Sequence, residues 1–123
     1  MDVLGAPYAL YATTANVTDR EGAILMFSQP DVSLPGLKKV LCDGGYSGDD
    51  FAAKIKVLTG AKVEVAKRSE LHKFAVIPKR WVVERTFGWL DKCRRLWKNC
   101  ERFITTTLNM VKLALLSVLL KRF

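Results

Sequence analysis

Two carboxylates in this chain occupy positions from which they could bind a metal ion. Asp43 follows the apolar run 39–42 and precedes two glycines, and Glu84 lies in a helical pattern among basic residues. Magnesium prefers oxygen ligands and keeps coordination sites open for phosphate oxygens. With a third carboxylate, these two would hold a pair of Mg²⁺ ions that clamp the attacking and leaving oxygens of a phosphoryl displacement. Nearby Arg and Lys side chains would then hold a phosphate backbone.

Each position also has a purely structural interpretation. A carboxylate at a strand end in an α/β sheet commonly faces the crevice where ligands bind, but Asp43-Gly44 is also a common turn dipeptide. The helix that carries Glu84 fits a solvated amphipathic helix equally well. The spacing of the two carboxylates therefore leaves both interpretations open.

The stretch 77–102 is predicted to form one long helix. Pro78 occupies a position that a first helical turn tolerates. Apolar residues recur near helical spacing and predict a face turned to a core; they are Trp81, Phe87, Leu90 and Trp97. Basic residues fill most of the remaining surface, so Glu84 is a carboxylate in a field of cations.

The rest of the chain predicts alternating strands and helices. Strands are expected at 8–14, 39–42 and 62–66, and helices at 20–29, from 49 to about 58, and from 105 towards the C-terminal end. Thr18 or Asp19 is a candidate N-cap for the first helix and Ser47 for the second. Gly60 is expected to close the second helix. The alternation predicts an α/β layer structure.

Length, charge and cysteine content narrow the class of protein. The 123 residues predict one small domain or part of a larger one, and the 50% of hydrophobic residues make disorder unexpected. The net charge of +8 favours nucleic acid or another polyanion as partner, although a merely basic protein has the same balance. The three cysteines lack CxxC spacing, and the chain has a single histidine, His72, so the sequence shows no zinc pattern. The odd number of cysteines favours a reducing location, the cytoplasm.

Membrane association is not expected from the sequence. No signal peptide opens the chain. The apolar run 104–120 is the one membrane candidate, but it is short, and Asn109 and Lys112 interrupt it. A buried core helix is the preferred interpretation of this run.

Several stretches, in the same order, resemble bacterial insertion-sequence transposases of the DDE superfamily. They are DVLG at 2–5, TTANVTDREGA at 13–23, VLCDGGYSG at 40–48, RWVVERTFGWL at 80–90 and RRL at 94–96. The resemblance runs from the first residues to about residue 103. It implies a ribonuclease H-like fold, with a mixed sheet, helices and long C-terminal helices. It also implies an enzyme that cuts DNA at transposon ends and joins the free 3′-hydroxyl to target DNA.

The same resemblance implies roles for individual residues. The family binds Mg²⁺ or Mn²⁺ with an Asp, Asp, Glu triad, in which Asp43 matches the second Asp and Glu84 the Glu. Around the Glu, the family has Tyr, two residues, Arg, three residues, Glu, six residues and Lys. Arg80 matches that Arg, whereas Ile77 and Asp91 replace the Tyr and the Lys. The residues expected to contact DNA are Arg80, Arg85, Lys92, Arg94, Arg95 and Lys98. The implied location is the bacterial cytoplasm, at the nucleoid.

The chain departs from the family pattern at its beginning. In such transposases the first catalytic Asp lies on a strand upstream of the region that 2–5 resembles, so Asp2 matches a hairpin residue. Residues 1–123 are therefore expected to be the C-terminal part of a catalytic domain, without its N-terminal strands and DNA-binding region. An unpaired sheet edge in such a part also predicts self-association.

Three functional hypotheses follow. The first is a transposase catalytic domain that is active only within a complete chain. The second is a non-catalytic DNA-binding remnant that competes with full-length transposase. The third is a helix-rich structural module with no role in nucleic-acid binding. Only the first requires Asp43, Glu84 and an upstream Asp encoded before the Met1 codon.

Overall fold

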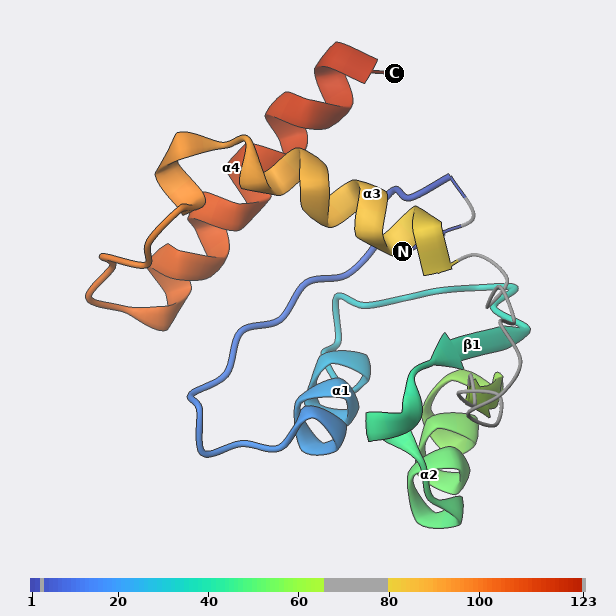
Figure 1. The fold of residues 1–123 in the computed structure, drawn as a ribbon. Coiled ribbons are helices and arrows are strands. Elements are labelled where there is room, and N and C mark those ends of the chain that lie inside the picture. The colour runs from blue at the N-terminus through green and yellow to red at the C-terminus, as the bar shows by residue number, and fades with distance from the viewer. Residues whose placement is uncertain (3, 66–79, 123) are drawn as a thin grey trace, which may run out of the picture. The chain divides into compact units, whose positions relative to one another are not determined.

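The computed structural model describes residues 1–2, 4–65 and 80–122, which belong to two compact units. Residues 15–77 make up one of them, called here the β-α-β unit. Residues 1–14 and 78–123 make up the other, called here the helical unit. Figure 1 shows their elements coloured along the chain. Each unit has buried residues of its own and is described by itself.

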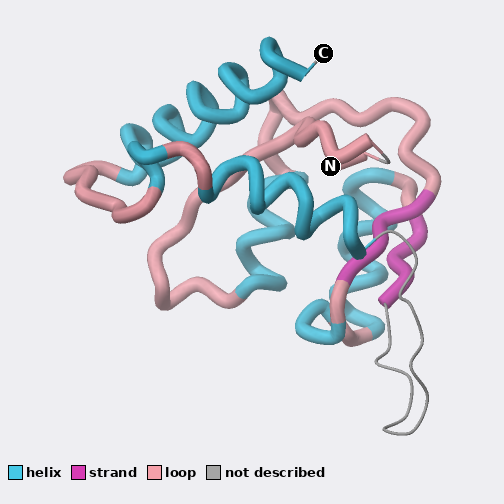
Figure 2. The backbone as a smooth tube through the Cα atoms, turned by 45° about the horizontal axis from the view of Figure 1, so that its top comes forward, coloured by secondary structure: helices cyan, strands magenta, loops and turns pink. Residues whose placement is uncertain are grey.

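The β-α-β unit is built on two parallel strands joined through a helix. Its elements are α1 (Asp19–Phe27), β1 (Lys39–Cys42), the 3-10 turn η1 (Gly44–Tyr46), α2 (Asp49–Thr59) and β2 (Lys62–Val65). The strands pair in register, with Val40 opposite Val63, and Figure 2 shows them side by side in magenta. Helix α2 packs against both β2 and α1.

Local signals in the sequence set the bounds of the two helices of this unit. The Thr18 hydroxyl accepts a hydrogen bond from the Glu21 N–H at 3.3 Å, and the Glu21 carboxylate accepts one from the Thr18 N–H at 3.0 Å. This capping box starts α1, and its hydrogen bonds to Thr18 lower the pKa of Glu21. Helix α2 ends at Gly60, whose φ of 73° lies in the left-handed region that favours glycine.

The core of the β-α-β unit is small. Its buried apolar residues are Phe51 and Ile55 from α2 and Ala61 beside β2. Burial of a large apolar side chain stabilises a fold by about 1.5–3 kcal/mol, so Phe51 and Ile55 are the main apolar contributions of α2 to this core. An exposed ion pair between Lys39 and Glu64, 2.6 Å apart, links the two strands. It lowers the pKa of Glu64, but exposed pairs add little stability.

The helical unit contains two helices and a connecting turn. Its elements are α3 (Arg80–Asp91), the 3-10 turn η2 (Arg94–Leu96) and α4 (Ile104–Arg122), coloured yellow to red in Figure 1. Helix α4 packs against α3 and η2. The buried side chains of these helices are Val82 and Thr86 on α3 and Leu115 on α4. Because Val82 and Thr86 are four residues apart, they lie on one face of α3.

A turn at the start of the chain packs on that face of α3. One carboxylate oxygen of Asp2 accepts hydrogen bonds from the N–H groups of Leu4, at 2.8 Å, and Ala6, at 2.9 Å. Gly5 is buried in the turn with φ of 86°, and the Thr86 hydroxyl donates to its carbonyl oxygen at 2.9 Å. A Cβ at Gly5 would lie 2.6 Å from the Thr86 hydroxyl oxygen, so only glycine fits there.

Three expectations about elements are wrong. The predicted helix over 77–102 ends at Asp91, and a 3-10 turn and a loop follow it. Residues 8–14 are described and form no strand. Gly48, rather than Ser47, is the N-cap of α2, and the Ser47 carbonyl oxygen instead accepts a hydrogen bond from the Arg20 guanidinium at 3.0 Å.

Helix α4 is not the buried core helix that its sequence predicts. Leu115 is its one buried residue, whereas Leu113, Leu116 and Leu120 are 57%, 53% and 76% exposed. Within the described part of the chain, α4 alone is long and apolar enough to cross a bilayer, with a mean hydropathy of 1.4. Core helices have the same length and composition, so these two properties do not identify a membrane span.

The fold class is confirmed at its coarse level. Helices combined with a small parallel sheet agree with the predicted α/β class. The strands β1 and β2 and the helix between them occur where the sequence predicts them. The ribonuclease H-like topology remains a prediction.

Candidate active site

Asp43 lies directly after the carboxyl end of β1. Its side chain is exposed, and one carboxylate oxygen accepts a hydrogen bond from the Gly45 N–H at 3.1 Å. Asp43 is thereby the N-cap of η1, so both the strand-end and the turn interpretations describe real features of this residue. The hydrogen bond orients the carboxylate without burying it, and the exposed carboxylate remains accessible to a cation.

The charge of Asp43 acts on two neighbouring side chains. Burial raises the pKa of the Cys42 thiol, and the Asp43 carboxylate raises it further. Burial is also the largest cause of the raised pKa of Tyr46, with smaller contributions from Asp19 and Asp43. Tyr46 packs on Phe51 with ring centroids 5.7 Å apart, which joins η1 to the core of the unit. The turn that follows Asp43 is therefore anchored to the core of the unit.

Glu84 lies on α3, in the helical unit, on the turn of helix that the N-terminal turn contacts. Its side chain is exposed. The next residue, Arg85, donates a hydrogen bond to the Leu4 carbonyl oxygen at 2.7 Å, and Thr86 donates to Gly5. These contacts hold the helix backbone that follows Glu84. The segment of α3 that carries Glu84 is consequently held against residues at the start of the chain.

Arg85 packs between two aromatic rings of its own helix. Its guanidinium carbon lies 4.8 Å from the ring centroid of Trp81 and 5.0 Å from that of Trp89. A second guanidinium, from Arg122 on α4, lies 4.1 Å from the Trp89 centroid. The Nε atom of Arg85 is buried and has no hydrogen-bond partner among the described residues. Arg85 therefore has a clear packing role, beside its predicted contact with DNA.

The other predicted DNA contacts lie at or after the ends of α3. Arg80 is the first residue of α3, and Lys92 directly follows its last. Arg94 and Arg95 belong to η2, and Lys98 follows η2 in the connecting loop. The last four are exposed. Ile77, which the resemblance places at the family Tyr position, lies outside the described residues, as does His72.

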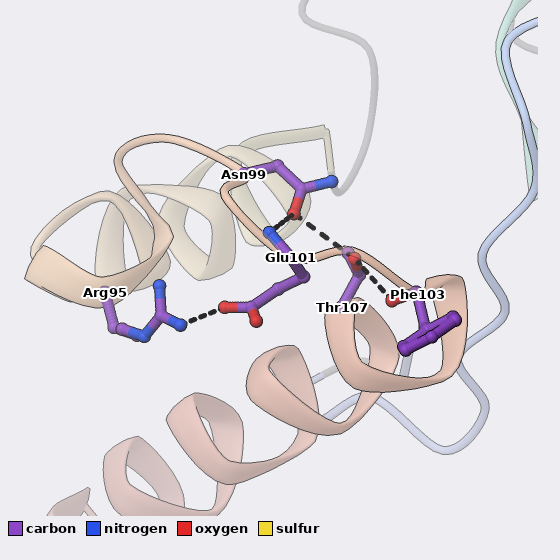
Figure 3. A network of polar contacts seen from close by, with 5 residues as sticks. All are labelled: Arg95, Asn99, Glu101, Phe103 and Thr107. Carbon is purple, nitrogen blue, oxygen red and sulfur yellow. Dashed lines mark hydrogen bonds and ion pairs between the residues drawn. The ribbon is translucent and has the colours of Figure 1, made fainter.

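A network of polar contacts holds the loop between η2 and α4 (Figure 3). Arg95 forms an ion pair with Glu101, whose side chain is 13% exposed. The Asn99 side-chain oxygen accepts hydrogen bonds from the Glu101 N–H and the Thr107 hydroxyl, both at 3.2 Å. Such a link from a side chain to the backbone two residues on is typical of a defined turn. The loop that carries several of the cations is therefore structured.

The exposed position of Trp97 differs from the sequence-based expectation. Its helical spacing predicts a core position, yet it is 82% exposed, as the C-cap of η2. Trp81 and Phe87 are also more than half exposed, at 56% each. The predicted core face of the long helix is therefore wrong for all three aromatics. The signal available in the sequence was a tryptophan among arginines and lysines, a combination typical of nucleic-acid surfaces.

The donor chemistry fits a hard divalent cation, but the number of gathered donors does not. Asp43 and Glu84 offer the oxygen ligands that Mg²⁺ prefers. They belong to different compact units, and no three Asp, Glu, His or Cys side chains gather around a common point within the described ranges. The described residues therefore do not form a complete metal site by themselves.

Comparisons with known proteins agree with the motifs. A family model described as the transposase DDE domain matches residues 1–119. A curated protein named "Putative transposase for insertion sequence element IS402", from Burkholderia cepacia, is 32% identical over an alignment of 108 residues. The match covers 82% of this chain and 51% of the relative. The chain thus spans about half the length of this relative. No solved structure matches it.

The family match includes the strand end at Asp43, the helix at Glu84 and the basic segment that follows. Members of the family generally use a divalent metal, in agreement with the oxygen donors found at those two positions. Since the match extends over nearly the whole sequence, the chain belongs to the DDE transposase-domain family of insertion-sequence elements.

Proposed function

We propose that this chain is part of the catalytic domain of a DNA transposase, which cuts DNA at transposon ends and joins the free 3′-hydroxyl to target DNA. The observation that carries the proposal is the exposed carboxylate of Asp43 at the carboxyl end of a parallel strand. Ligands of α/β sheets bind outside the carboxyl ends of strands. The family match and the IS402 relative support the same activity.

In this proposal Asp43 and Glu84 are two of the carboxylates that bind Mg²⁺ or Mn²⁺. A divalent metal would stabilise the charge that develops on the phosphate during strand cleavage and joining. Two carboxylates fall short of the set that a pair of ions needs. The site is therefore complete only with a further carboxylate from outside the described residues, such as the first Asp of the family triad.

The basic residues around η2 would neutralise DNA phosphates. Lys92, Arg94 and Lys98 are exposed cations within one short segment. Arg95 shares its charge with Glu101, and Arg85 packs on two tryptophans, so we assign these two a smaller part in binding. In this proposal the protein acts on transposon-end and target DNA at the nucleoid, in the bacterial cytoplasm.

A non-catalytic function is the second candidate. In this alternative the chain binds DNA and competes with full-length transposase, without cutting it. It is favoured by the exposed cations around η2, which can bind DNA without any metal site. Both candidates require DNA binding, and they differ only in the need for Asp43 and Glu84.

Duplex binding and its salt dependence test the part that both candidates share. We expect non-specific binding to a labelled duplex that weakens by about 150-fold between 50 and 200 mM salt, if roughly four phosphates are contacted. The double substitution Arg94→Ala and Lys98→Ala should weaken binding and lower the salt slope by about 0.9 for each phosphate that is no longer neutralised.

The control is a pair of exposed lysines in the β-α-β unit, Lys38→Ala and Lys56→Ala. They remove the same total charge from elsewhere in the chain. If this pair lowers the salt slope as much as Arg94→Ala with Lys98→Ala, binding reflects net charge alone. Absence of duplex binding at low salt would refute both candidate functions.

A further inference from the structure

The three tryptophans of the chain differ in what covers their rings. Trp81 has the Arg85 guanidinium 4.8 Å from its ring centroid, and Trp89 has guanidinium groups at 5.0 and 4.1 Å. Trp97 has no ring or cation stacked on it among the described residues, and it is 82% exposed. Exposing so much of a large aromatic ring is unfavourable in water. Trp97 is therefore the ring that is open to a partner.

The charge around Trp97 limits the chemistry of that partner. The segment 92–102 contains five basic residues, namely Lys92, Arg94, Arg95, Lys98 and Arg102. Its single acidic residue, Glu101, already pairs with Arg95. An aromatic ring within such a segment matches a polyanion that also carries flat apolar groups. Nucleic acid has both properties, and unpaired bases present the flat face that stacking requires.

The loop between η2 and α4, which follows Trp97, is ordered by side-chain contacts, and a binding platform requires such order. The ion pair of Arg95 with Glu101 and the hydrogen bonds of Asn99 to Glu101 and Thr107 close it (Figure 3). The Thr107 hydroxyl shares its single hydrogen between the Asn99 side-chain oxygen and the Phe103 carbonyl oxygen, 3.3 Å away, and so ties the loop to the first turn of α4. A ring displayed from an ordered loop loses little conformational entropy when a base stacks on it.

A neighbouring aromatic residue is less suited to the same role. Phe103 is 62% exposed, but the guanidinium carbon of Arg102 lies 5.5 Å from its ring centroid. Part of its face is therefore already in use. This difference favours Trp97 over Phe103, which directly follows the basic segment.

We propose that Trp97 is a stacking platform for an unpaired DNA base, with Arg94 and Lys98 holding the phosphates beside that base. The inference rests on the proposed DNA binding and adds to it a preference for single-stranded or frayed DNA. Duplex contacts then come from the cations, whereas the preference for unpaired bases comes from the ring.

Comparison of single-stranded and duplex DNA separates the ring from the charge. The probes are a labelled oligothymidylate of about 16 nucleotides, which is within the range of known single-strand sites, and a duplex of the same length. Trp97→Ala should weaken single-strand binding by about 5- to 150-fold, the range expected when one base stack is removed. It should change duplex binding by less than about twofold, since a ring stacks poorly on paired bases. Trp97→Phe should restore most of the single-strand affinity.

Two further measurements make the result specific. Tyr8→Ala removes an aromatic residue that is 68% exposed but lies outside the basic segment, and it should leave both affinities unchanged. Oligothymidylate should quench tryptophan fluorescence in the wild type and in Trp81→Phe, but not in Trp97→Phe. Far-UV circular dichroism checks that each variant is folded.

The outcomes that would overturn the inference are distinct. If Trp97→Ala weakens single-strand and duplex binding equally, or if it changes neither affinity, the ring does not recognise unpaired bases. If it alters light scattering while oligonucleotide binding is unchanged, the ring contacts protein instead. Either result leaves the salt-dependent duplex binding of the proposed function intact. If the wild-type chain binds no DNA at all, both the proposed function and this inference are refuted.

Discussion

At the scale of single residues, Gly5 joins distant parts of the chain. Its turn lies at the N-terminus, yet its carbonyl oxygen accepts the hydrogen bond of Thr86, 81 positions later. Arg85 makes the same kind of link to Leu4. These contacts therefore hold the helix backbone next to Glu84, the predicted metal ligand, against the start of the chain.

Gly5→Ala tests this packing. The left-handed φ of 86° and a Cβ only 2.6 Å from the Thr86 hydroxyl oxygen are both unfavourable for alanine. We expect the free energy of unfolding to fall by about 2–3 kcal/mol, at the upper end of what such strain costs. Urea denaturation measures the change.

The control for Gly5→Ala is Gly36→Ala. Gly36 has a similar φ of 80°, but nothing lies within 4 Å of a Cβ built there. Gly36→Ala should therefore lower the free energy of unfolding only by the cost of backbone strain, about 1 kcal/mol. Equal losses at the two positions would mean that the contact with Thr86 contributes nothing.

Cys42 reports on the charge of Asp43. Burial and the Asp43 carboxylate both raise the pKa of this thiol, so a smaller fraction is thiolate at pH 8 than in an unperturbed cysteine. With Cys93 and Cys100 replaced by serine, alkylation by iodoacetamide should be slow. Asp43→Asn should lower the pKa and speed alkylation by less than about tenfold, since burial, the larger cause, remains.

Metal binding at Asp43 should act in the same direction as Asp43→Asn. A bound Mg²⁺ offsets the carboxylate charge and so lowers the pKa of the Cys42 thiol. The rate of alkylation should then rise with Mg²⁺ in the wild type but not in Asp43→Asn. Asp49→Asn, an exposed carboxylate in the same unit, should leave the response to Mg²⁺ unchanged. No response to Mg²⁺ in the wild type would count against metal binding by this residue in the isolated chain.

At the scale of elements, the predictable parts are those that local signals determine. The capping box at Thr18, the apolar run that forms β1 and the left-handed Gly60 each operate within a few residues. The sequence therefore predicts the β-α-β segment and the place of Asp43 after β1. The packing of the Asp2 turn on α3 depends on partners about 80 positions away, which no local pattern contains.

The predicted long helix is wrong beyond Asp91, because the backbone leaves the helical conformation there and Cys93 is extended, with φ of −82° and ψ of 102°. Apolar residues continue at helical spacing past Asp91, and this periodicity alone suggests one helix. The Asn99 side chain instead bonds the Glu101 N–H, and Glu101 pairs with Arg95. Side-chain contacts of this kind favour a turn over continued helix. Trp97 follows the break at Cys93, as the C-cap of η2, so it does not lie on the predicted helix face.

Helix α4 presents apolar side chains to solvent. Leu113, Leu116 and Leu120 are each more than half exposed, and their spacing of three and four residues places them on one face. Together with two strands that each have an unpaired edge among the described residues, this face predicts concentration-dependent self-association. Leu113→Lys with Leu116→Lys should shift the chain towards monomer, as measured by light scattering after size-exclusion chromatography.

The matched control for the leucine face is Ser117→Lys. Ser117 is exposed and adjacent to Leu116, so this change adds positive charge to α4 while keeping the leucines. It should leave self-association largely unchanged. A wild-type chain that stays monomeric at all concentrations would show that the exposed leucines do not mediate self-association.

At the scale of the whole molecule, the family assignment and the metal chemistry rest on different observations. Motifs spread along the sequence are sufficient for the family, and the match over residues 1–119 confirms it. Asp43 and Glu84 belong to different compact units, and whether both hold the same metal is a separate question. Local patterns carry no information on that question, because each describes only a few neighbouring residues. The metal site is therefore the part that the sequence predicts least.

Whether this chain can cleave and join DNA depends on how many carboxylates hold its metal ions. Mg²⁺ gives up its water ligands reluctantly and binds weakly to few charged groups, and a pair of ions must stay in place while charge develops on the phosphate. We therefore expect no detectable cleavage or joining of transposon-end DNA by this chain alone. Fusion to the upstream segment of a relative that carries the first Asp of the triad should restore both reactions.

In the restored protein, Glu84→Gln should lower the cleavage rate by about 100-fold or more, the scale on which removal of a single electrostatic stabiliser acts. Glu64→Gln is the control, since Glu64 is exposed and pairs only with Lys39 among the described residues, so this change should leave the rate unaltered. Gel-based assays of nicked and joined strands measure both effects. If the isolated chain cuts DNA with Mg²⁺ and Glu84→Gln stops it, another carboxylate of this chain completes the site. If the fusion stays inactive but still binds duplex DNA, the chain acts as the non-catalytic competitor.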